Sequence, residues 1–295
     1  MTMHLALVVN PASGRHRAAS IAERAAVRLR AAGHTAHLVE GADGASSRRL
    51  AAEAVATGAD ALVVVGGDGA LHGALDLVAG GEVLFGLLPA GTGNDTARSL
   101  GIPTHDVDAA IDVLLAGHVR TVDLARTGDS HVATVIASGF DSKVNERANA
   151  MRWPRGNMRY NLAILAELRS FEPLPFTLTL DGTPVEREAM LVAVGNGPSF
   201  GGGLRICEGA VIDDGLLDVV VINPVSKATL LRVFPQLYRG THVDLPEFER
   251  HLVTEVTLSS PGIVAYGDGE RLGALPLTAT VRPGALRVLA PPAPT

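Results

Sequence analysis

The chain has one cysteine and few aromatic side chains. Cys207 is the only cysteine among 295 residues. This excludes a disulfide within the chain and any zinc site built from several cysteines, and it fits a reducing cytoplasm. Aromatic residues make up 4% of the chain and hydrophobic residues 47%, so we expect a core of Ala, Val and Leu. Apolar runs stay well short of the roughly 18 residues that a membrane-spanning helix needs.

Positive charge is also scarce, and the formal net charge is -6 at pH 7. A chain with this balance is not expected to bind nucleic acid by bulk electrostatic attraction. The first residues lack a basic segment followed by a long apolar stretch, so no signal peptide is expected. We therefore expect a cytoplasmic protein that would meet a membrane only peripherally, at its inner face. The sequence does not indicate an oligomeric state, and a homodimer is left open.

The first 125 or so residues alternate short apolar runs with longer segments of helical period. Such alternation is typical of a Rossmann-like α/β domain with a mainly parallel sheet. The expected strands are His4–Val9, His37–Glu40, Ala61–Val65 and Val83–Leu88, and the expected helices are Arg17–Ala32, Ser46–Thr57, Ala70–Val78, Thr96–Leu100 and Asp106–Leu115.

After residue 125 the pattern changes to short β-branched runs between Gly, Pro and Asp, which is typical of an antiparallel β-sandwich. The expected strands are Val132–Ala137, Phe176–Leu180, Ala189–Val194, Leu217–Ile222, Val253–Leu258, Ile263–Tyr266 and Ala285–Leu289, with helices only at Asn157–Ser170 and Lys227–Tyr238. We therefore predict two domains, 1–125 and 126–295. The last strand could pack on either of them.

Three loops rich in glycine and polar residues each follow a predicted strand of the first domain. They are Asn10-Pro11-Ala12-Ser13-Gly14-Arg15, Gly66-Gly67-Asp68-Gly69 and Pro89-Ala90-Gly91-Thr92-Gly93-Asn94-Asp95. Ligands of doubly wound sheets sit outside the carboxyl ends of the strands, so these loops should converge on one crevice. Glycine lets a backbone approach a bulky anion, and the helix expected after Gly69 offers N–H groups to phosphate. The loops together predict a phosphate site.

Asp68 and Asp95 lie beside the expected phosphates, which carboxylates alone would repel. Their presence makes sense if they engage Mg²⁺ directly or through its waters. The only two lysines, Lys143 and Lys227, lie outside the first domain, so a P-loop lysine is absent. Arg15 is a cation placed to bind phosphate through both arms of its guanidinium group. A solvated surface charge is the alternative for Arg15.

These motifs, in this order and spacing, resemble the diacylglycerol kinase catalytic domain, in particular that of bacterial lipid kinases and sphingosine kinases. The resemblance continues at Gly139-Phe140-Asp141, Asn196-Gly197, Gly201–Gly203, Asp213–Asp218 and Asp268-Gly269-Glu270, and so covers nearly the whole chain. It implies ATP and Mg²⁺ in a cleft between an α/β domain and a β-sandwich domain. The implied reaction is transfer of the γ-phosphoryl group to the hydroxyl of diacylglycerol or a related lipid.

The resemblance also implies roles for individual residues. Asp68 and Asp95 would belong to the magnesium network, and Glu270 would be the general base. The nucleotide would be bound by Asn10, Pro11, Ala12, Ser13, Gly14, Arg15, Gly66, Gly67, Asp68, Gly69, Gly91, Thr92 and Asn94. A divalent metal ion would be bound by the side chain of Asp214 and the carbonyl oxygens of Leu216 and Val211. A hairpin turn without a metal is the alternative at Asp214.

Three places depart from the family pattern, one of them around Val39-Glu40, where relatives often have a Thr near the nucleotide and this chain has none in register. Ala70 stands where Thr is usual after Gly-Gly-Asp-Gly, and Gly73 stands where Glu is common, which weakens details of nucleotide binding. An NAD kinase or another small-molecule kinase with this loop is one alternative function. A non-catalytic regulator that binds a nucleotide or a lipid is another, which the presence of Asp68, Asp95 and Glu270 disfavours.

The segment from Arg147 to Tyr160 mixes cations with large apolar groups and holds the only Trp, Trp153. Such a mixture is typical of a contact with an anionic lipid surface. An ordinary loop and helix with an inward apolar side is the alternative. On the first interpretation, this segment would be the peripheral membrane contact of the protein.

Overall fold

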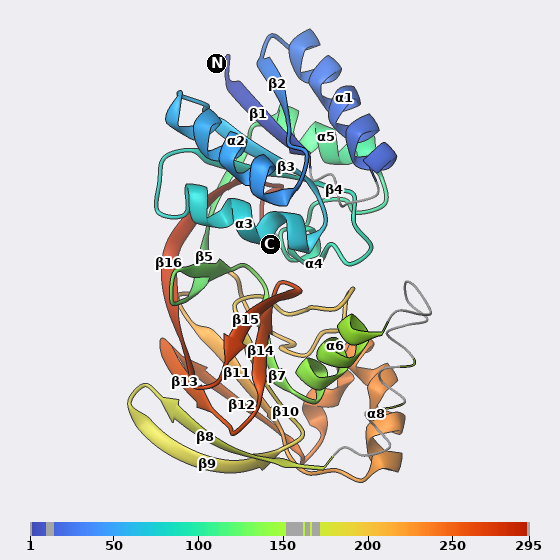
Figure 1. The fold of residues 1–295 in the computed structure, drawn as a ribbon, viewed down its shortest axis with the longest axis vertical. Helices are drawn as coiled ribbons and strands as arrows, with labels where there is room; N and C mark the ends of the chain where they lie inside the picture. Colours follow the sequence, from blue (N-terminus) through green and yellow to red (C-terminus); the bar gives the residue numbers. More distant parts are fainter. Residues whose placement is uncertain (1, 10–14, 152–161, 163–165, 167–171, 294–295) are drawn as a thin grey trace.

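The computed structural model describes residues 2–9, 15–151, 162, 166 and 172–293. In the first part of the chain, strands and helices alternate (Figure 1). The elements are β1 (His4–Val9), α1 (Arg15–Ala31), β2 (Thr35–Glu40), α2 (Gly44–Ala56), β3 (Ala61–Gly66), α3 (Asp68–Val78), β4 (Leu84–Pro89), α4 (Asp95–Ser99) and α5 (Val107–Ala116). Each was expected from the sequence, with ends within about two residues of those found.

The strands β2, β1, β3 and β4 lie side by side in that order, and all of them are parallel. All six residues of β3 are buried, as are five of the six in β1 and in β4. These continuous apolar runs suit strands that are covered on both faces. Local signals mark the helix boundaries: Asp43 caps the start of α2 by accepting the amide of Ser46, and Gly117 ends α5 in the left-handed conformation. The predicted α/β domain is confirmed.

Strands dominate the second part of the chain. The elements are β5 (Val119–Thr127), β6 (Ser130–Val132), β7 (Val135–Gly139), α6 (Phe140–Ala150), β8 (Leu174–Leu180), β9 (Thr183–Ala189), β10 (Leu191–Gly195), β11 (Leu217–Ile222), α8 (Lys227–Arg239), a 3₁₀ turn (Thr241–Asp244), β12 (Phe248–Val253), β13 (Glu255–Ser259), β14 (Val264–Gly267), β15 (Glu270–Ala274) and β16 (Leu277–Leu289).

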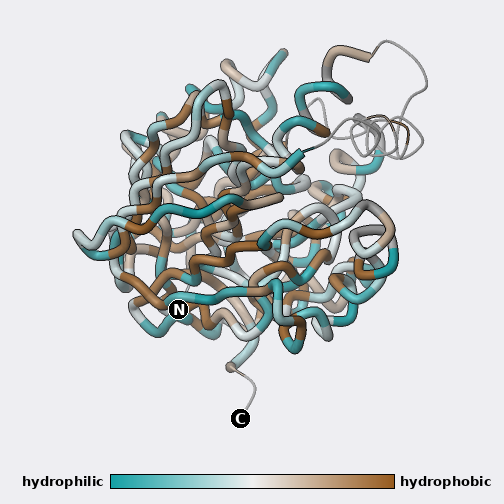
Figure 2. Tube along the Cα trace, turned by 90° about the horizontal axis from the view of Figure 1, so that it is seen from below, coloured by the Kyte–Doolittle hydropathy of each residue, from teal (hydrophilic) through white to brown (hydrophobic). Residues whose placement is uncertain are grey.

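Two sheets enclose the core of this part. One has the order β12-β11-β10-β7-β14-β15 and is antiparallel throughout, and the other brings β16, β13, β8 and β9 together. Their facing side chains form one buried cluster, with Phe176 and Val256 from one sheet and Val192 and Val219 from the other. Figure 2 shows hydrophobic segments towards the middle of the trace and hydrophilic ones towards its periphery. The predicted antiparallel sandwich is confirmed.

Several details differ from expectation, among them the strands β5, β9, β12 and β15, which were not expected. The strand expected at Val132–Ala137 is divided into β6 and β7 by Ala133 and Thr134, and α6 is a helix that was not expected. The helix expected at Asn157–Ser170 falls outside the described residues, except at positions 162 and 166. In the described part of the chain, no helix combines the length and the apolar character needed to cross a membrane.

The last strand belongs to both parts of the molecule. The start of β16 pairs with β13, and its end pairs with β5 and, at Val288, with β4 of the parallel sheet. The pairing with β5 is interrupted between Arg282 and Leu286. The sheet therefore runs from the α/β part into the sandwich. The predicted boundary between residues 125 and 126 falls inside β5 and stays a prediction.

Candidate active site

The loops after β3 and β4 lie directly against each other. Gly66 pairs with Pro89 at the carboxyl ends of the two strands, and the amide of Ala90 donates to the carbonyl of Gly66 at 2.9 Å. A Cβ atom at Gly91 would lie 2.6 Å from Cα of Gly67, so the contact requires glycine. The first loop, Asn10 to Gly14, lies outside the described residues, and Arg15 is described only as the first residue of α1.

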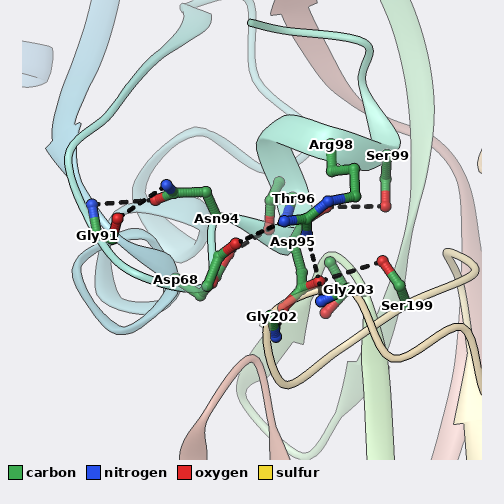
Figure 3. A network of polar contacts seen from close by, with 12 residues as sticks. Asp68, Gly91, Asn94, Asp95, Thr96, Arg98, Ser99, Ser199, Gly202 and Gly203 are labelled. Carbon is green, nitrogen blue, oxygen red and sulfur yellow. Dashed lines mark hydrogen bonds and ion pairs between the residues drawn. The ribbon is translucent and has the colours of Figure 1, made fainter. Parts of the chain in front are cut away.

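Asn94 holds the loop after β4 in shape. Its φ of 55° is left-handed, and its side chain makes two hydrogen bonds to Gly91 (Figure 3). The Gly91 amide donates to Oδ1 at 3.0 Å, and Nδ2 donates to the Gly91 carbonyl at 2.9 Å. Asn94 therefore stabilises the loop from within. The predicted nucleotide contacts of Asn94 and Thr92 stay predictions.

Asp68 begins α3 and faces the same loop. The amide of Thr96 donates to its Oδ1 at 3.2 Å. A Cβ atom at Gly93 would lie 2.7 Å from Oδ2 of Asp68 and 3.4 Å from Oδ2 of Asp95, so the two carboxylates meet at Gly93. Burial raises the pKa of Asp68 above its ordinary value, and the charge of Asp95 raises this pKa further. A cation here would relieve that repulsion.

Asp95 joins the two halves of the molecule (Figure 3). Its side chain is 4% exposed, and its Oδ2 accepts the amide of Gly202 at 2.6 Å. Oδ1 accepts the amide of Gly203 at 2.7 Å, the hydroxyl of Ser199 at 3.2 Å and Nη1 of Arg98 at 2.7 Å. Three of these four donors come from the loop after β10. The contact with this loop could not be predicted from the sequence, because two of its donors are backbone amides more than 100 residues away.

Glu270 reaches the loop after β3 from the second half of the chain. It is the first residue of β15, and it pairs with Gly267 across a two-residue turn. The turn residues, Asp268 and Gly269, have φ of 50° and 85°, and type I′ hairpins require positive φ at both positions. A Cβ atom at Gly69 would lie 2.8 Å from Oε1 of Glu270. The Glu270 carboxylate therefore lies against the N-terminal turn of α3, at the residue after Asp68.

Asp268 is buried directly behind this tip. Its Oδ2 accepts the amide of Ala133 at 2.7 Å, and its Oδ1 accepts the amide and hydroxyl of Thr134 at 2.9 and 2.5 Å. Burial raises the pKa of Asp268 to about 6 against these hydrogen bonds, and the charge of Asp68 adds to the shift. Sequence reasoning missed Asp268, although an Asp-Gly pair before Glu270 is a hairpin signal.

The donor chemistry suits Mg²⁺ that arrives with a nucleotide. Among the described residues, no group of three or more His, Cys, Asp or Glu side chains is placed to hold a metal ion. Asp68 can supply one oxygen, and Mg²⁺ in kinases is typically held by one or two carboxylates together with substrate phosphates. Asp95 already accepts three hydrogen bonds at Oδ1 and one at Oδ2, so only Oδ2 has a lone pair left for a cation. These residues therefore fit a metal ion brought by phosphates.

At the second predicted metal site, around Asp214, the carboxylates have partners within the protein. Oδ1 of Asp214 accepts the amide of Leu216 at 3.0 Å, and the side chain of Val211 is exposed. The neighbouring carboxylates have other partners: Asp213 pairs with Arg120, and Asp218 pairs with a second arginine in β12. The assignment of Asp214, Leu216 and Val211 as metal ligands stays a prediction.

Comparison with known proteins agrees with this geometry. Residues 4–127 match the diacylglycerol kinase catalytic domain, and residues 134–290 match the YegS C-terminal NAD kinase beta sandwich-like domain. A protein named diacylglycerol kinase from Mycobacterium tuberculosis is 44% identical over 290 residues, which cover 96% of this chain and 94% of that protein.

Two solved structures share the fold. The crystal structure of a diacylglycerol kinase from Bacillus anthracis has a TM-score of 0.74 at 22% identity and covers 98% of this chain and 97% of its own. An NAD kinase from Archaeoglobus fulgidus in complex with ATP has a TM-score of 0.52 at 14% identity, with 96% and 92% covered. The chain belongs to the diacylglycerol kinase family, with the catalytic domain first and a YegS-type C-terminal domain after it.

Proposed function

We propose that the protein is an ATP-dependent lipid kinase, which transfers the γ-phosphoryl group of ATP to the hydroxyl of diacylglycerol or a related lipid. One observation carries this proposal: the carboxylate of Glu270 reaches across from the second half of the chain to Gly69, the residue after Asp68 at the start of α3. On this proposal, a base from the second half would face a phosphate-binding loop of the first half. The similarity to a protein named diacylglycerol kinase supports the choice of a lipid acceptor.

On this proposal, the first half of the chain binds the phosphates. The backbone of Gly66–Gly69 and the N-terminal amides of α3, an 11-residue helix, would donate to the phosphate oxygens. Asp68 would hold Mg²⁺, which neutralises phosphate charge when it is bound. The predicted contacts of Arg15 and of the residues from Asn10 to Gly14 belong to the same proposal.

Glu270 would take the proton of the acceptor hydroxyl. Phosphoryl transfer needs little covalent help from the protein, so catalysis depends on positions and charges. The base must lie within reach of the hydroxyl when the latter is in line with the γ-phosphate. Glu270 lies beside Gly69, one residue from Asp68. This position supports the proposal that Glu270 acts on a hydroxyl near the phosphates.

We assign Asp95 a supporting role rather than a direct place in the magnesium network. Its two oxygens already accept four donors, three of them from the Ser199–Gly203 loop. These donors satisfy a buried carboxylate, and loss of the carboxylate would leave the donors unpaired. Asp95 would thereby keep the second half of the molecule in register with the loop that carries Asp68.

The contact with the membrane that holds the lipid acceptor is also a proposal. A lipid acceptor implies work at a membrane surface, and the cationic and apolar segment from Arg147 to Tyr160 would make that contact. Most of this segment, including Trp153, lies outside the described residues. Vesicle co-sedimentation of variants with Arg152 and Arg155 changed to Glu tests it. Unchanged binding to anionic vesicles would exclude this segment as the contact.

The test of the function uses radiolabelled ATP, Mg²⁺ and a total lipid extract, followed by identification of the labelled product. We expect a labelled lipid phosphate from the wild-type protein and none from the Asp68→Ala variant. Labelled NADP from added NAD, with no labelled lipid, would instead assign the protein to NAD phosphorylation. A protein that labels neither acceptor but binds ATP would be a regulator.

A further inference from the structure

We propose that Asp268 is a positioning residue for Glu270, which it holds at the cleft by fixing the tip of the β14–β15 hairpin to the Ala133–Thr134 segment. The inference rests on the proposed function, because it takes Glu270 to be the base of the reaction. It goes further in assigning a role to a buried carboxylate that does not face the acceptor.

The hairpin needs such an anchor because of its place in the sheet. β15 is the edge strand of its sheet and pairs only with β14. The turn that precedes Glu270 is two residues long and points towards the first half of the molecule (Figure 1). Edge hairpins with few packed neighbours are among the less stable parts of a fold. A base at such a tip would lack a fixed position without further contacts.

Asp268 supplies these contacts. Its side chain is buried, with the residue 3% exposed, and its oxygens accept three hydrogen bonds, two from backbone amides and one from the Thr134 hydroxyl. Charge-assisted bonds of this kind are about twice as strong as neutral ones. Gly267 adds a steric fit, since a Cβ atom there would lie 2.7 Å from Cγ2 of Val132. Gly267 and Asp268 are thus both held against residues 132–134.

The anchoring segment is itself fixed on its other side. Nδ2 of Asn196 donates to the carbonyl of Ala133 at 3.0 Å. The amides of Asn196 and Gly197 both donate to the carbonyl of Thr134, at 2.8 and 3.0 Å. Every backbone polar group of Ala133 and Thr134 therefore has a partner. Asp268 is held by a rigid part of the protein.

The same segment is tied to α3, the helix that Asp68 begins. The amide and Nδ1 of His131 both lie within hydrogen-bond distance of Oδ1 of Asp76, at 2.9 and 3.0 Å. Oδ2 of Asp76 also pairs with Arg48 at 3.3 Å. These contacts link α3, through Asp76 and His131, to the segment that holds Asp268 and the tip before Glu270.

The chain offers a matched control at a second Asp-Gly turn. Asp181, with φ of 43°, and Gly182 join β8 and β9, and Oδ1 of Asp181 accepts the amide and hydroxyl of Thr254 and the amide of Glu255. As at Asp268, the carboxylate accepts two backbone amides and one Thr hydroxyl, but here all three donors share Oδ1 and the residue is exposed. β8 and β9 lie on the side of the second half that faces away from α3 (Figure 1).

The experiment is a double-mutant cycle on kcat with diacylglycerol micelles and Mg-ATP. Asp268→Asn should lower kcat by about 10-fold or more and leave KM for ATP nearly unchanged, because it displaces a base rather than a phosphate ligand. In a Glu270→Gln background the same change should cost less than about twofold, because the group that it positions is already lost. Thr134→Val, which removes the hydroxyl donor, should lower kcat by less than Asp268→Asn does. Thr134→Ser, which keeps the hydroxyl, should retain a kcat close to that of the wild type.

The controls and contrary outcomes distinguish failure of the positioning role of Asp268 from failure of the proposed lipid kinase function. Asp181→Asn and Thr254→Val should leave kcat unchanged. Equal losses from Asp268→Asn in both backgrounds, or a rise in KM for ATP at constant kcat, would overturn the positioning role alone. If Asp268→Asn does not fold, the comparison of Thr134→Val with Thr134→Ser decides, and equal kcat values would reject the inference. A wild-type protein that phosphorylates no lipid would overturn the proposed function itself.

Discussion

The carboxylate of Glu270 occupies the space in which a side chain at Gly69 would stand. A Cβ atom on Gly69 would lie 2.8 Å from Oε1 of Glu270. The Gly69→Ala variant should therefore fold but push Glu270 away from the cleft. A displacement of about 1 Å can cost about 10²-fold in rate, so we expect kcat to fall on that order. The free energy of unfolding should change by less than about 1 kcal/mol, because Ala suits a helix better than Gly.

Gly73→Ala in the same helix is the control for Gly69→Ala. A Cβ atom at Gly73 would lie 3.7 Å from Cδ of Arg48, which is an ordinary contact. Steady-state kinetics and urea unfolding of both variants test the prediction. Equal kcat values for the two variants would show that the contact between Gly69 and Glu270 does not matter for turnover.

Asp95 should matter for stability as well as for activity. The Asp95→Asn variant would set an amide NH₂ group against the amide donors of the Ser199–Gly203 loop. Loss of a partner at a buried polar group costs about 1–3 kcal/mol, and we expect the free energy of unfolding to fall by this amount. Ser199→Ala removes one donor and should cost about 1 kcal/mol or less. Urea unfolding at pH 7 measures both.

A direct metal role for Asp95 would give another result. In that case Asp95→Asn would leave the free energy of unfolding unchanged and would raise the Mg²⁺ concentration needed for half-maximal activity.

Titration of Asp268 should contribute to the pH dependence of the free energy of unfolding. Burial raises its pKa in the folded protein from 3.8 to about 6. Between these values the folded protein holds a proton that the unfolded chain has released, so stability falls as pH rises through this window. The Asp268 contribution is therefore full below about pH 4 and lost above about pH 6. The Asp268→Asn variant has no such group.

The measurement is the difference in free energy of unfolding between the wild type and Asp268→Asn, without nucleotide and metal ions. We expect this difference to decline by about 1–3 kcal/mol from pH 4.5 to pH 7.5. A difference that rises with pH over this range would mean that the three hydrogen bonds to Asp268 outweigh its burial.

The sequence was sufficient to predict features that depend on neighbouring residues. The strands and helices of the first half were all expected, because buried parallel strands are continuous apolar runs and capping residues mark the helices. The loops after β3 and β4 were expected to meet, since the carboxyl ends of parallel strands share one edge. The strand β12, Phe-Glu-Arg-His-Leu-Val, was missed because its charged residues hide an edge strand.

Features that depend on distant backbone groups could not be predicted. The division between β6 and β7 has no Gly or Pro to mark it. It arises where Ala133 and Thr134 give their amides to Asp268, more than 130 residues away. Three of the four donors of Asp95, which belong to Ser199, Gly202 and Gly203, are also more than 100 residues away, and only Arg98 is local. A sequence shows that such a carboxylate exists, but the partner that satisfies it depends on the complete fold.

The central claim is that Glu270 acts as the base in phosphoryl transfer to a lipid. The most direct test is the rate of transfer from radiolabelled ATP to diacylglycerol by Glu270→Gln, relative to the wild type, at saturating Mg-ATP. We predict a loss of about 10²–10⁴-fold, the usual contribution of a general base, with no change in the Kd for ATP. A Glu270→Gln variant that turns over at nearly the wild-type rate would contradict the claim.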